Sequence, residues 1–175
     1  YEACNNGWNV YFGVNPRIGG AGKKENVHYL TSFHAEIDYG KAGHKKKPEY
    51  LTYEEALKAI QDYDLSPTII NHSGGGFHCY WVLNNAISVE KHGVETLESI
   101  NKGLCHDLKA DSGTHHLVMI LRIPETFNQK LPGNPREVTV ITMAGPKYDF
   151  EDFERFLKPV EPAESKEKNK PATST

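Results

Sequence analysis

The segment that decides the fold reads Ser32-Phe33-His34-Ala35-Glu36-Ile37-Asp38-Tyr39-Gly40. Apolar residues alternate there with His34, Glu36 and Asp38, and this alternation predicts a strand with one apolar and one polar face. The two carboxylates therefore share a face, with their Cα atoms roughly 7 Å apart. Two neighbouring carboxylates repel each other unless a cation or a proton lies between them. The segment thus predicts either a divalent-metal platform or an acidic, half-exposed strand.

The composition is typical of a soluble globular protein. The chain has 175 residues, of which 38% are hydrophobic and 25% are charged, enough for one domain with a real core. No segment approaches the roughly 18 consecutive apolar residues that a membrane helix needs. Three cysteines without CxxC spacing argue against a disulfide framework and against a thiolate zinc site, and they favour a reducing compartment. With a net charge of −3, contact with nucleic acid would depend on local patches or on other domains.

The remaining periodicity predicts a mixture of strands and helices. Strands are expected at 8–14, 27–38, 67–71, 77–83, 118–123 and 137–143, and helices at 53–63, at 88–108 and after Asp149. Thr52 and Glu55 form the capping box of the first helix. Because the elements alternate irregularly and include hairpins, a mixed α+β fold is expected rather than a doubly wound parallel sheet.

The end of the chain differs in composition from the rest. From Pro159 onward it contains Pro, Glu, Lys, Ser and Thr with almost nothing apolar, which predicts a disordered tail or an interdomain linker. We therefore expect a folded domain over 1–158 and a tail over 159–175. Because the chain starts at Tyr1 without methionine, we also expect it to be a domain cut from a longer polypeptide.

A glycine-rich turn is a second candidate for chemistry. It reads Ser73-Gly74-Gly75-Gly76-Phe77-His78. Consecutive glycines let a backbone approach a ligand closely and can present N–H groups to an anion. Ser73 and His78 flank that turn, and His78 shares its strand face with Tyr80. A hairpin turn with a packed histidine is the alternative explanation.

Further acidic and basic residues follow. Asp111 fits a turn at a helix end, the usual role of an Asp-Ser-Gly sequence, or a third carboxylate for the platform. Arg122 offers a planar fork for phosphate oxygens, and Lys130 offers a point charge. Exposed basic residues often serve only solubility, and the sequence alone does not bring these groups to Glu36 and Asp38.

The order of these segments resembles the archaeo-eukaryotic primase superfamily, in particular the primase-polymerase domains of plasmid, phage and CRISPR-associated replication proteins. That family has a paired acidic motif, a small-residue turn ending in histidine, a third acid, and an Arg-hydrophobic-Pro-Gly-Thr-x-Asn-x-Lys segment. Here these read Glu36-Ile37-Asp38, Ser73-Gly74-Gly75-Gly76-Phe77-His78, Asp111 and Arg122-Ile123-Pro124-Glu125-Thr126-Phe127-Asn128-Gln129-Lys130. The opening Tyr11-Phe12-Gly13-Val14-Asn15-Pro16-Arg17 also resembles the family's first strand and turn. The chain departs from the pattern at Glu36, where Asp is commoner, and at Glu125, where Gly is usual.

The resemblance implies a small α/β module packed beside an RRM-like sheet, with the active site in the cleft between them. It implies a template-dependent DNA primase-polymerase that adds nucleotides from an NTP or dNTP to a 3′-hydroxyl, using two Mg²⁺ or Mn²⁺ ions. The implied catalytic residues are Glu36, Asp38, His78 and Asp111, and the three acids among them are the metal ligands. The implied nucleotide-binding residues are Ser73, Gly75, Gly76, His78, Arg122, Asn128 and Lys130. Candidates for contact with template or nucleotide are Arg17, Tyr11, Lys45, Lys46 and Lys47.

The implied partners are a single-stranded DNA template with its primer and further domains of the same polypeptide. No membrane is involved, and we expect a cytoplasmic location in a prokaryotic plasmid or phage setting.

Two other functions remain open at this point. A mononuclear non-haem iron oxygenase would use His34, Glu36 and either His78 or His115 as a two-histidine, one-carboxylate site. That assignment leaves Asp38 without a role. A non-catalytic RNA- or DNA-binding module is also compatible with an RRM-like sheet. Such a sheet should show exposed aromatic residues where this strand shows carboxylates.

Overall fold

The strand expected around Glu36 is present. In the computed structural model, which describes residues 2–19, 22–41 and 48–157, strand β2 spans Tyr29–Asp38 and pairs antiparallel with β4, Gly76–Ser88. The register of the pair shifts once, between Leu30 and Ser32, and is regular from there to Asp38. The side chains around the two carboxylates are therefore held by a continuous ladder. The predicted template contacts Lys45, Lys46 and Lys47 and the tail from 159 lie outside the described residues.

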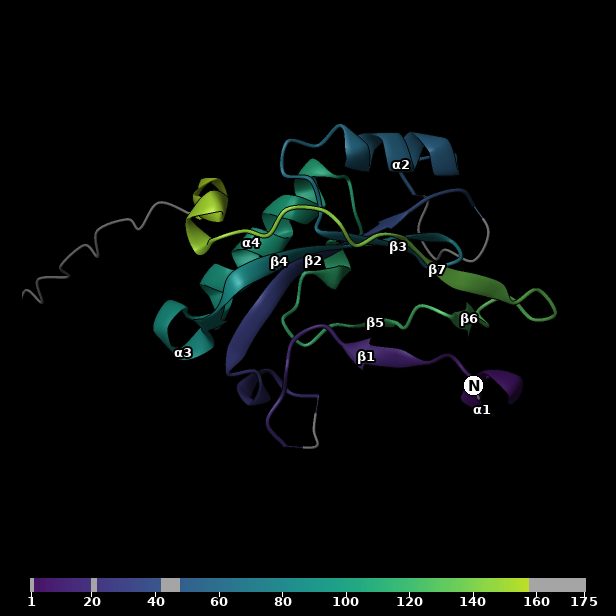
Figure 1. The fold of residues 1–175 in the computed structure, drawn as a ribbon, viewed down its shortest axis with the longest axis horizontal. Coiled ribbons are helices and arrows are strands. Elements are labelled where there is room, and N and C mark those ends of the chain that lie inside the picture. Colours follow the sequence, from purple (N-terminus) through teal and green to yellow (C-terminus); the bar gives the residue numbers. More distant parts are fainter. Residues whose placement is uncertain (1, 20–21, 42–47, 158–175) are drawn as a thin grey trace, which may run out of the picture.

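Two antiparallel sheets form the framework. The main sheet has five strands in the order β2-β4-β3-β7-β6, where β3 is Ile69–His72, β6 is Thr126–Asn128 and β7 is Arg136–Thr142. A separate ribbon joins β1, Tyr11–Gly13, to β5, Ile120–Arg122. Figure 1 shows this ribbon on one side of the main sheet and helices α2 and α4 on the other.

The helices are short. They are α1, Glu2–Asn5; α2, Tyr53–Gln61; α3, Val89–His92; α4, Val94–Asp107; and the 3-10 helices η1, Lys24–Asn26; η2, Ser112–Thr114; and η3, Phe150–Phe156. The predicted capping box of α2 is confirmed, since the Glu55 N–H donates to Thr52 Oγ1 at 3.2 Å and the Thr52 N–H donates to Glu55 Oε2 at 3.3 Å. No helix of the described residues is both long and apolar enough to cross a membrane.

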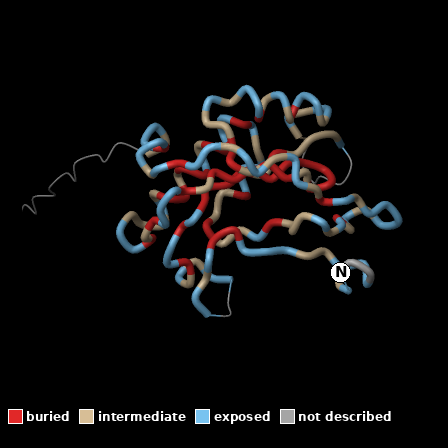
Figure 2. The backbone as a smooth tube through the Cα atoms, in the orientation of Figure 1, coloured by how far each residue is buried: buried red, intermediate tan, exposed pale blue. Residues whose placement is uncertain are grey.

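The core lies between the main sheet and its helices. It contains the alternate apolar residues of β2 and β4, which are Phe33, Ala35, Ile37, Phe77, Cys79 and Trp81. Figure 2 shows the buried segments concentrated along these strands. A smaller cluster of Val14, Tyr80 and Leu121 joins the opposite face of the sheet to the ribbon. The alternation in the sequence therefore decides which face packs against helices and which faces the ribbon.

The structure differs from the sequence expectations in three elements. The single helix expected over 88–108 is broken at Gly93, whose φ of 81° lies in the left-handed region that glycine tolerates. Strand β4 runs to Ser88 instead of ending near Leu83, because its end pairs with Tyr29 and Leu30. The short strand β6 was not expected. The mixed α+β class is confirmed.

Candidate active site

Glu36, Asp38 and His78 share one face of the main sheet. Glu36 lies directly opposite His78 in the β2–β4 ladder, and Asp38 lies opposite Gly76. Residues directly opposite each other in an antiparallel pair point to the same face. The predicted common face of the two carboxylates is thus present, with the histidine beside them.

The Glu36–His78 contact is the centre of this face. His78 Nε2 lies 3.5 Å from Glu36 Oε1, at the outer limit of a hydrogen bond, and the His78 side chain is 1% exposed. Neither of its ring nitrogens has a hydrogen-bond partner. Such buried, unsatisfied polar atoms are rare in folded proteins and are typical of sites where a substrate group or an ion completes the bonding.

Positive charge converges on Glu36. Burial alone would raise the pKa of its carboxyl, but the contact with His78 and the charges of Arg122 and Lys130 hold that pKa below its usual value. Arg122 comes from β5, and its guanidinium stacks over the Tyr11 ring at 5.3 Å from the ring centroid. The structure therefore brings the two predicted basic residues from the Arg122–Lys130 segment toward the acidic face.

Asp111, the third predicted acid, contacts Glu36 through a bond between their main chains. The Asp111 N–H donates to the Glu36 carbonyl oxygen at 3.0 Å, across the outer edge of β2. Its carboxylate caps η2, because Oδ1 accepts from the Gly113 N–H at 3.0 Å. Among the described residues, the carboxylates of Glu36, Asp38 and Asp111 do not form a group whose ligand atoms all lie within 4.8 Å of one another. The exposed Asp111 side chain would have to turn away from its cap to join them.

The glycine turn before β4 packs closely against the main chain of β2. A Cβ at Gly76 would lie 2.5 Å from the Ile37 carbonyl oxygen, so only glycine lets β4 start beside β2. Asn128 Nδ2 donates to the Ser73 carbonyl at 2.8 Å, and Ser73 Oγ donates to the Gly76 carbonyl at 3.1 Å. Both side chains are buried. In this arrangement Ser73 and Asn128 hold the turn that presents His78.

Arg17 is also engaged with the protein. Its Nη2 donates to the Val118 carbonyl at 2.5 Å and to the Met119 carbonyl at 3.4 Å. These bonds fasten the segment after β1 to the segment that leads into β5. Contact of Arg17 with nucleotide or template stays a prediction.

The iron alternative is not supported by the position of His34. Its side chain is fully buried, Nε2 donates to the Thr114 carbonyl at 2.9 Å, and Nδ1 lies 3.5 Å from Asn101 Nδ2. Burial lowers the pKa of His34 to about 4, so the ring is neutral at pH 7 and one nitrogen donates while the other accepts. Both nitrogens are thus occupied by protein groups, and neither is available to join Glu36 at a metal.

Asn71 and Arg136 lie in this region and were not predicted from the sequence, whereas Tyr80 was expected on the face of His78. Asn71 lies opposite His78 on β3, and Tyr80 follows on β4; both are 4% exposed, and Asn71 Oδ1 and Tyr80 Oη lack hydrogen-bond partners. They line a largely apolar hollow of about 250 Å³ with Phe12, Val14, Ser32, Ile69, Val82, Pro124, Val140 and Met143. Arg136 packs against the turn, where its Nη2 would lie 3.0 Å from a Cβ at Gly75. The pairing of the strands brings Asn71 next to His78, and no local sequence pattern predicts that pairing.

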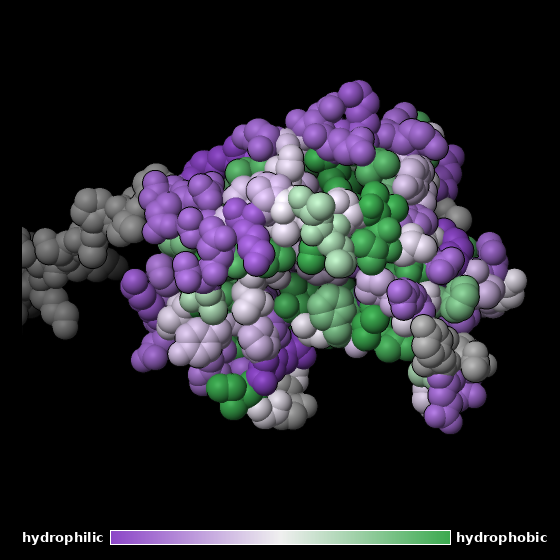
Figure 3. All heavy atoms as spheres, in the orientation of Figure 1, coloured by the Kyte–Doolittle hydropathy of each residue, from purple (hydrophilic) through white to green (hydrophobic). Residues whose placement is uncertain are grey.

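Several of the apolar side chains that line this hollow are exposed at the surface. Figure 3 shows hydrophobic side chains gathered across the middle of the face in view, with the hydrophilic surface of α2 above them. Large exposed apolar side chains of the described residues include Phe12, Val140, Ile141 and Met143.

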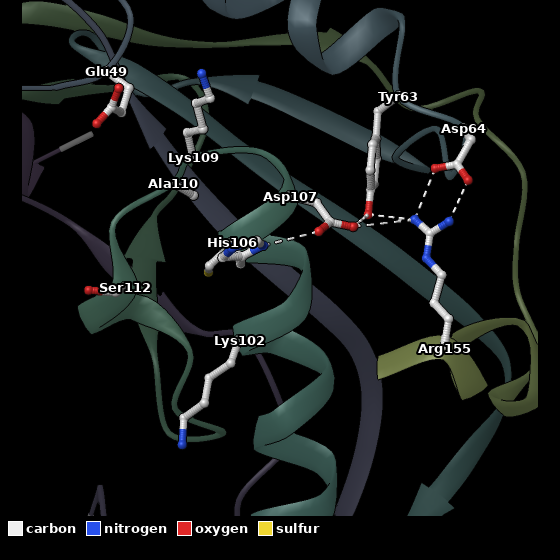
Figure 4. Close-up of a pocket in the computed structure, with 11 residues that line it drawn as sticks. Glu49, Tyr63, Asp64, Lys102, His106, Asp107, Lys109, Ala110, Ser112 and Arg155 are labelled. Atoms are coloured by element: carbon white, nitrogen blue, oxygen red, sulfur yellow. Dashed lines mark hydrogen bonds and ion pairs between the residues drawn. The ribbon is translucent and has the colours of Figure 1, made fainter. Parts of the chain in front are cut away.

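A larger hollow lies elsewhere. It measures about 810 Å³ and is lined by Glu49, Tyr63, Asp64, Lys102, Cys105, His106, Asp107, Lys109, Ala110, Ser112 and Arg155. Figure 4 shows Arg155 reaching from η3 to Asp64, Tyr63 and Asp107. No predicted site residue lines it. The ion pairs join η3 to the loop after α2 and to the end of α4, which is a structural role.

Comparisons with known proteins support the fold. No family model matches the sequence, and no curated protein matches it. Among solved structures, the AEP domain of the primase-polymerase of cyanophage S-2L is similar with a TM-score of 0.64 and 15% identity, covering 90% of this chain and 74% of that one. Primase RepB′ is similar with a TM-score of 0.51 and 12% identity, covering 72% of this chain and 39% of that one. The five-stranded sheet, the ribbon beside it and these two likenesses together show that the chain has the same α+β fold as these primase and primase-polymerase domains.

Proposed function

We propose that this protein is a template-dependent DNA primase-polymerase that transfers a nucleotide from an NTP or dNTP to a 3′-hydroxyl. The observation that supports this most is the pairing of Glu36 with the buried His78 on a face toward which Arg122 and Lys130 direct positive charge. A triphosphate needs cationic groups near its oxygens, and metal ions need carboxylate ligands. This face offers the basic side chains for the first and the carboxylates for the second.

The acidic residues suit Mg²⁺ or Mn²⁺. These hard cations prefer carboxylate oxygens, and Glu36 is held in its ionised form while keeping a side chain that is 22% exposed. Glu36 and Asp38 would hold the ions, joined by Asp111 once its side chain leaves the cap of η2. When bound, the ions lower the pKa of the attacking hydroxyl and neutralise charge on the triphosphate.

The protein groups around the acids have separate tasks. His78 has two unsatisfied ring nitrogens and can donate a hydrogen bond to a phosphate oxygen. Arg122 offers a bidentate fork to phosphate, and Lys130 adds a point charge. Ser73 and Asn128 fix the turn that places His78, and Tyr11 presents an exposed ring on which a base can stack.

We also propose partners and a cellular location for the enzyme. The nucleic-acid partners are a single-stranded template and its primer, and further domains of the same polypeptide assist binding. Cys79 and Cys105 are free, buried thiols, which suits the reducing conditions of a cytoplasm. A plasmid or phage replication system is the proposed genetic context.

Extension of a labelled primer with Mg²⁺ or Mn²⁺ tests the activity. The double substitution Glu36→Ala with Asp38→Ala should abolish extension, because it removes the oxygens that hold the ions. The control is Glu90→Ala with Glu95→Ala, which removes the same charge from exposed positions of α3 and α4 and should leave extension unchanged.

Thermal unfolding of each variant shows whether the fold survives. Extension retained by a folded Glu36/Asp38 variant rules out the proposed mechanism. Binding of single-stranded DNA by a wild type that never extends a primer would instead support the non-catalytic binding module.

A further inference from the structure

Glu98 is a buried acid outside the face just described. It belongs to α4, and it is 5% exposed. Lys24 Nζ lies 2.8 Å from each of its carboxylate oxygens, and the Leu117 N–H donates to Oε1 at 3.2 Å. Burial alone would raise the pKa of Glu98, but these donors hold it below its usual value. A full negative charge is therefore kept inside the protein, and a cation has to accompany it.

Two histidines stand next to this carboxylate. His116 Nδ1 lies 3.3 Å from Glu98 Oε1, and the rings of His115 and His116 are 4.0 Å apart between centroids. Within the described part of the chain, Glu98, His115 and His116 are the one group of three whose possible ligand atoms all lie within 4.8 Å of one another. None of these residues belongs to the Glu36–Asp38 pair.

The segment that carries the histidines is fixed before any ion arrives. His115 Nδ1 donates to the Ser112 carbonyl at 2.6 Å, which leaves Nε2 as the free acceptor of a neutral ring. Asn101 Nδ2 donates to the His115 carbonyl at 3.0 Å, and Thr114 Oγ1 donates to the Asp111 carbonyl at 2.8 Å. A backbone carbonyl that orients the second nitrogen of a histidine is the usual companion of a metal-ligating imidazole.

The ligand types select the metal. Two imidazole nitrogens and one carboxylate suit Zn²⁺, whereas Mg²⁺ and Mn²⁺ favour sites made of oxygen. Three protein ligands leave a fourth position for water. The His116 side chain is 41% exposed, so an ion can enter from solvent. The side chain of Lys24 is 42% exposed, and its flexible stem allows the ammonium to swing out.

We propose that Glu98, His115 and His116 form a Zn²⁺ site in which the ion takes the place of the Lys24 ammonium. The bound ion would join α4 to the segment 111–117. The first residue of that segment, Asp111, donates its N–H to the Glu36 carbonyl. In this position the ion would hold the segment that carries Asp111 against α4.

Calorimetric titration of the chelator-treated full chain with Zn²⁺ alone tests this site. One equivalent should bind and raise the temperature of unfolding. His115→Gln and His116→Gln should each weaken binding by at least about tenfold. Lys24→Met should strengthen binding, because the competing ammonium is gone. Co²⁺ in place of Zn²⁺ should give the visible absorption of a four-coordinate ion.

Two controls separate this site from others. His106→Gln changes a histidine whose side chain is 89% exposed at the end of α4, and it should leave zinc binding unchanged. Glu36→Ala with Asp38→Ala should also leave it unchanged. The proposal is overturned if the wild type takes up no zinc, if both histidine variants bind as wild type does, or if Lys24→Met binds no more tightly. None of these readouts depends on nucleotide transfer.

Discussion

At the scale of single residues, Glu36 shows how the site keeps a charge in a partly buried place. Burial opposes ionisation, and the neighbours His78, Arg122 and Lys130 favour it more strongly. Its pKa in the folded protein is therefore lower than the 4.5 of a free side chain. A lowered folded-state pKa contributes stability above the unfolded-state value, and that stability is lost as the pH falls through the folded-state value.

We therefore expect Glu36→Gln to be less stable than wild type at pH 7. The difference should shrink as the pH falls below about 4.5 and through the lower folded-state pKa, because wild-type Glu36 then becomes neutral as well. Urea unfolding of both proteins at several pH values measures it. Glu90→Gln, an exposed carboxylate on α3, reports the effect of removing a surface charge. A difference for Glu36→Gln that stays constant down to strongly acid pH would contradict this account.

Glu125 has an unusual backbone conformation that should affect stability. Its φ is 62°, in the left-handed region, and its N–H donates to the Val138 carbonyl at 2.7 Å. A side chain in that region costs about 1–2 kcal/mol, and glycine avoids the cost while losing more entropy on folding. We expect Glu125→Gly to stabilise the protein by about 0.5–1 kcal/mol. Glu125→Ala keeps the Cβ and should give no gain, and equal effects of both substitutions in urea unfolding would exclude backbone strain as the cause.

At the scale of elements, the contact between α4 and η3 depends on a glycine in the middle of a helix. A Cβ at Gly103 would lie 2.1 Å from Phe156 Cδ1, so the ring of η3 rests on the helix backbone. Alanine favours a helix by about 1 kcal/mol over glycine, whereas overpacking costs about 1–3 kcal/mol. We expect Gly103→Ala to be destabilising by about 1 kcal/mol in wild type.

In a Phe156→Ala background the sign should reverse, and Gly103→Ala should stabilise by up to about 1 kcal/mol because only the helix preference remains. A double-mutant cycle by urea unfolding measures this coupling. Additive effects of the two substitutions would show that the ring does not restrict residue 103.

The elements also show what the sequence could predict. The alternation around Glu36 and the Thr52–Glu55 box are local patterns, and the strand and the helix they predicted are present. The shared face of His78 and Tyr80 follows from alternation within one strand, as predicted. The location of Asn71 beside His78 depends on the register between β3 and β4, which no local pattern contains. A turn at Asp111 is a local prediction from Asp-Ser-Gly, but its backbone bond to β2 could not be predicted, because that contact joins segments 75 residues apart.

At the scale of the whole molecule, the boundary expected near residue 158 can be tested by truncation. Leu157 still packs against the core, so a chain that ends at residue 158 should unfold within about 0.5 kcal/mol of the full chain. A chain that ends at residue 148 loses Phe153, which is fully buried with its ring 4.6 Å from that of Phe33. This loss should cost about 3–5 kcal/mol, as for other buried aromatic side chains. Circular dichroism during heating compares the three chains, and a large loss in the first truncation would move the boundary.

The bond between the Asp111 N–H and the Glu36 carbonyl has a consequence for the behaviour of the chain in concentrated solution. Strand β2 forms one border of the main sheet, and unpaired main-chain groups on a border invite strand addition by another molecule. The segment that carries Asp111 occupies that border at Glu36. The opposite border is formed by β6, which is only three residues long and offers few main-chain groups for pairing. Changes that loosen the Asp111 segment should therefore promote pairing between molecules at β2, and with it aggregation.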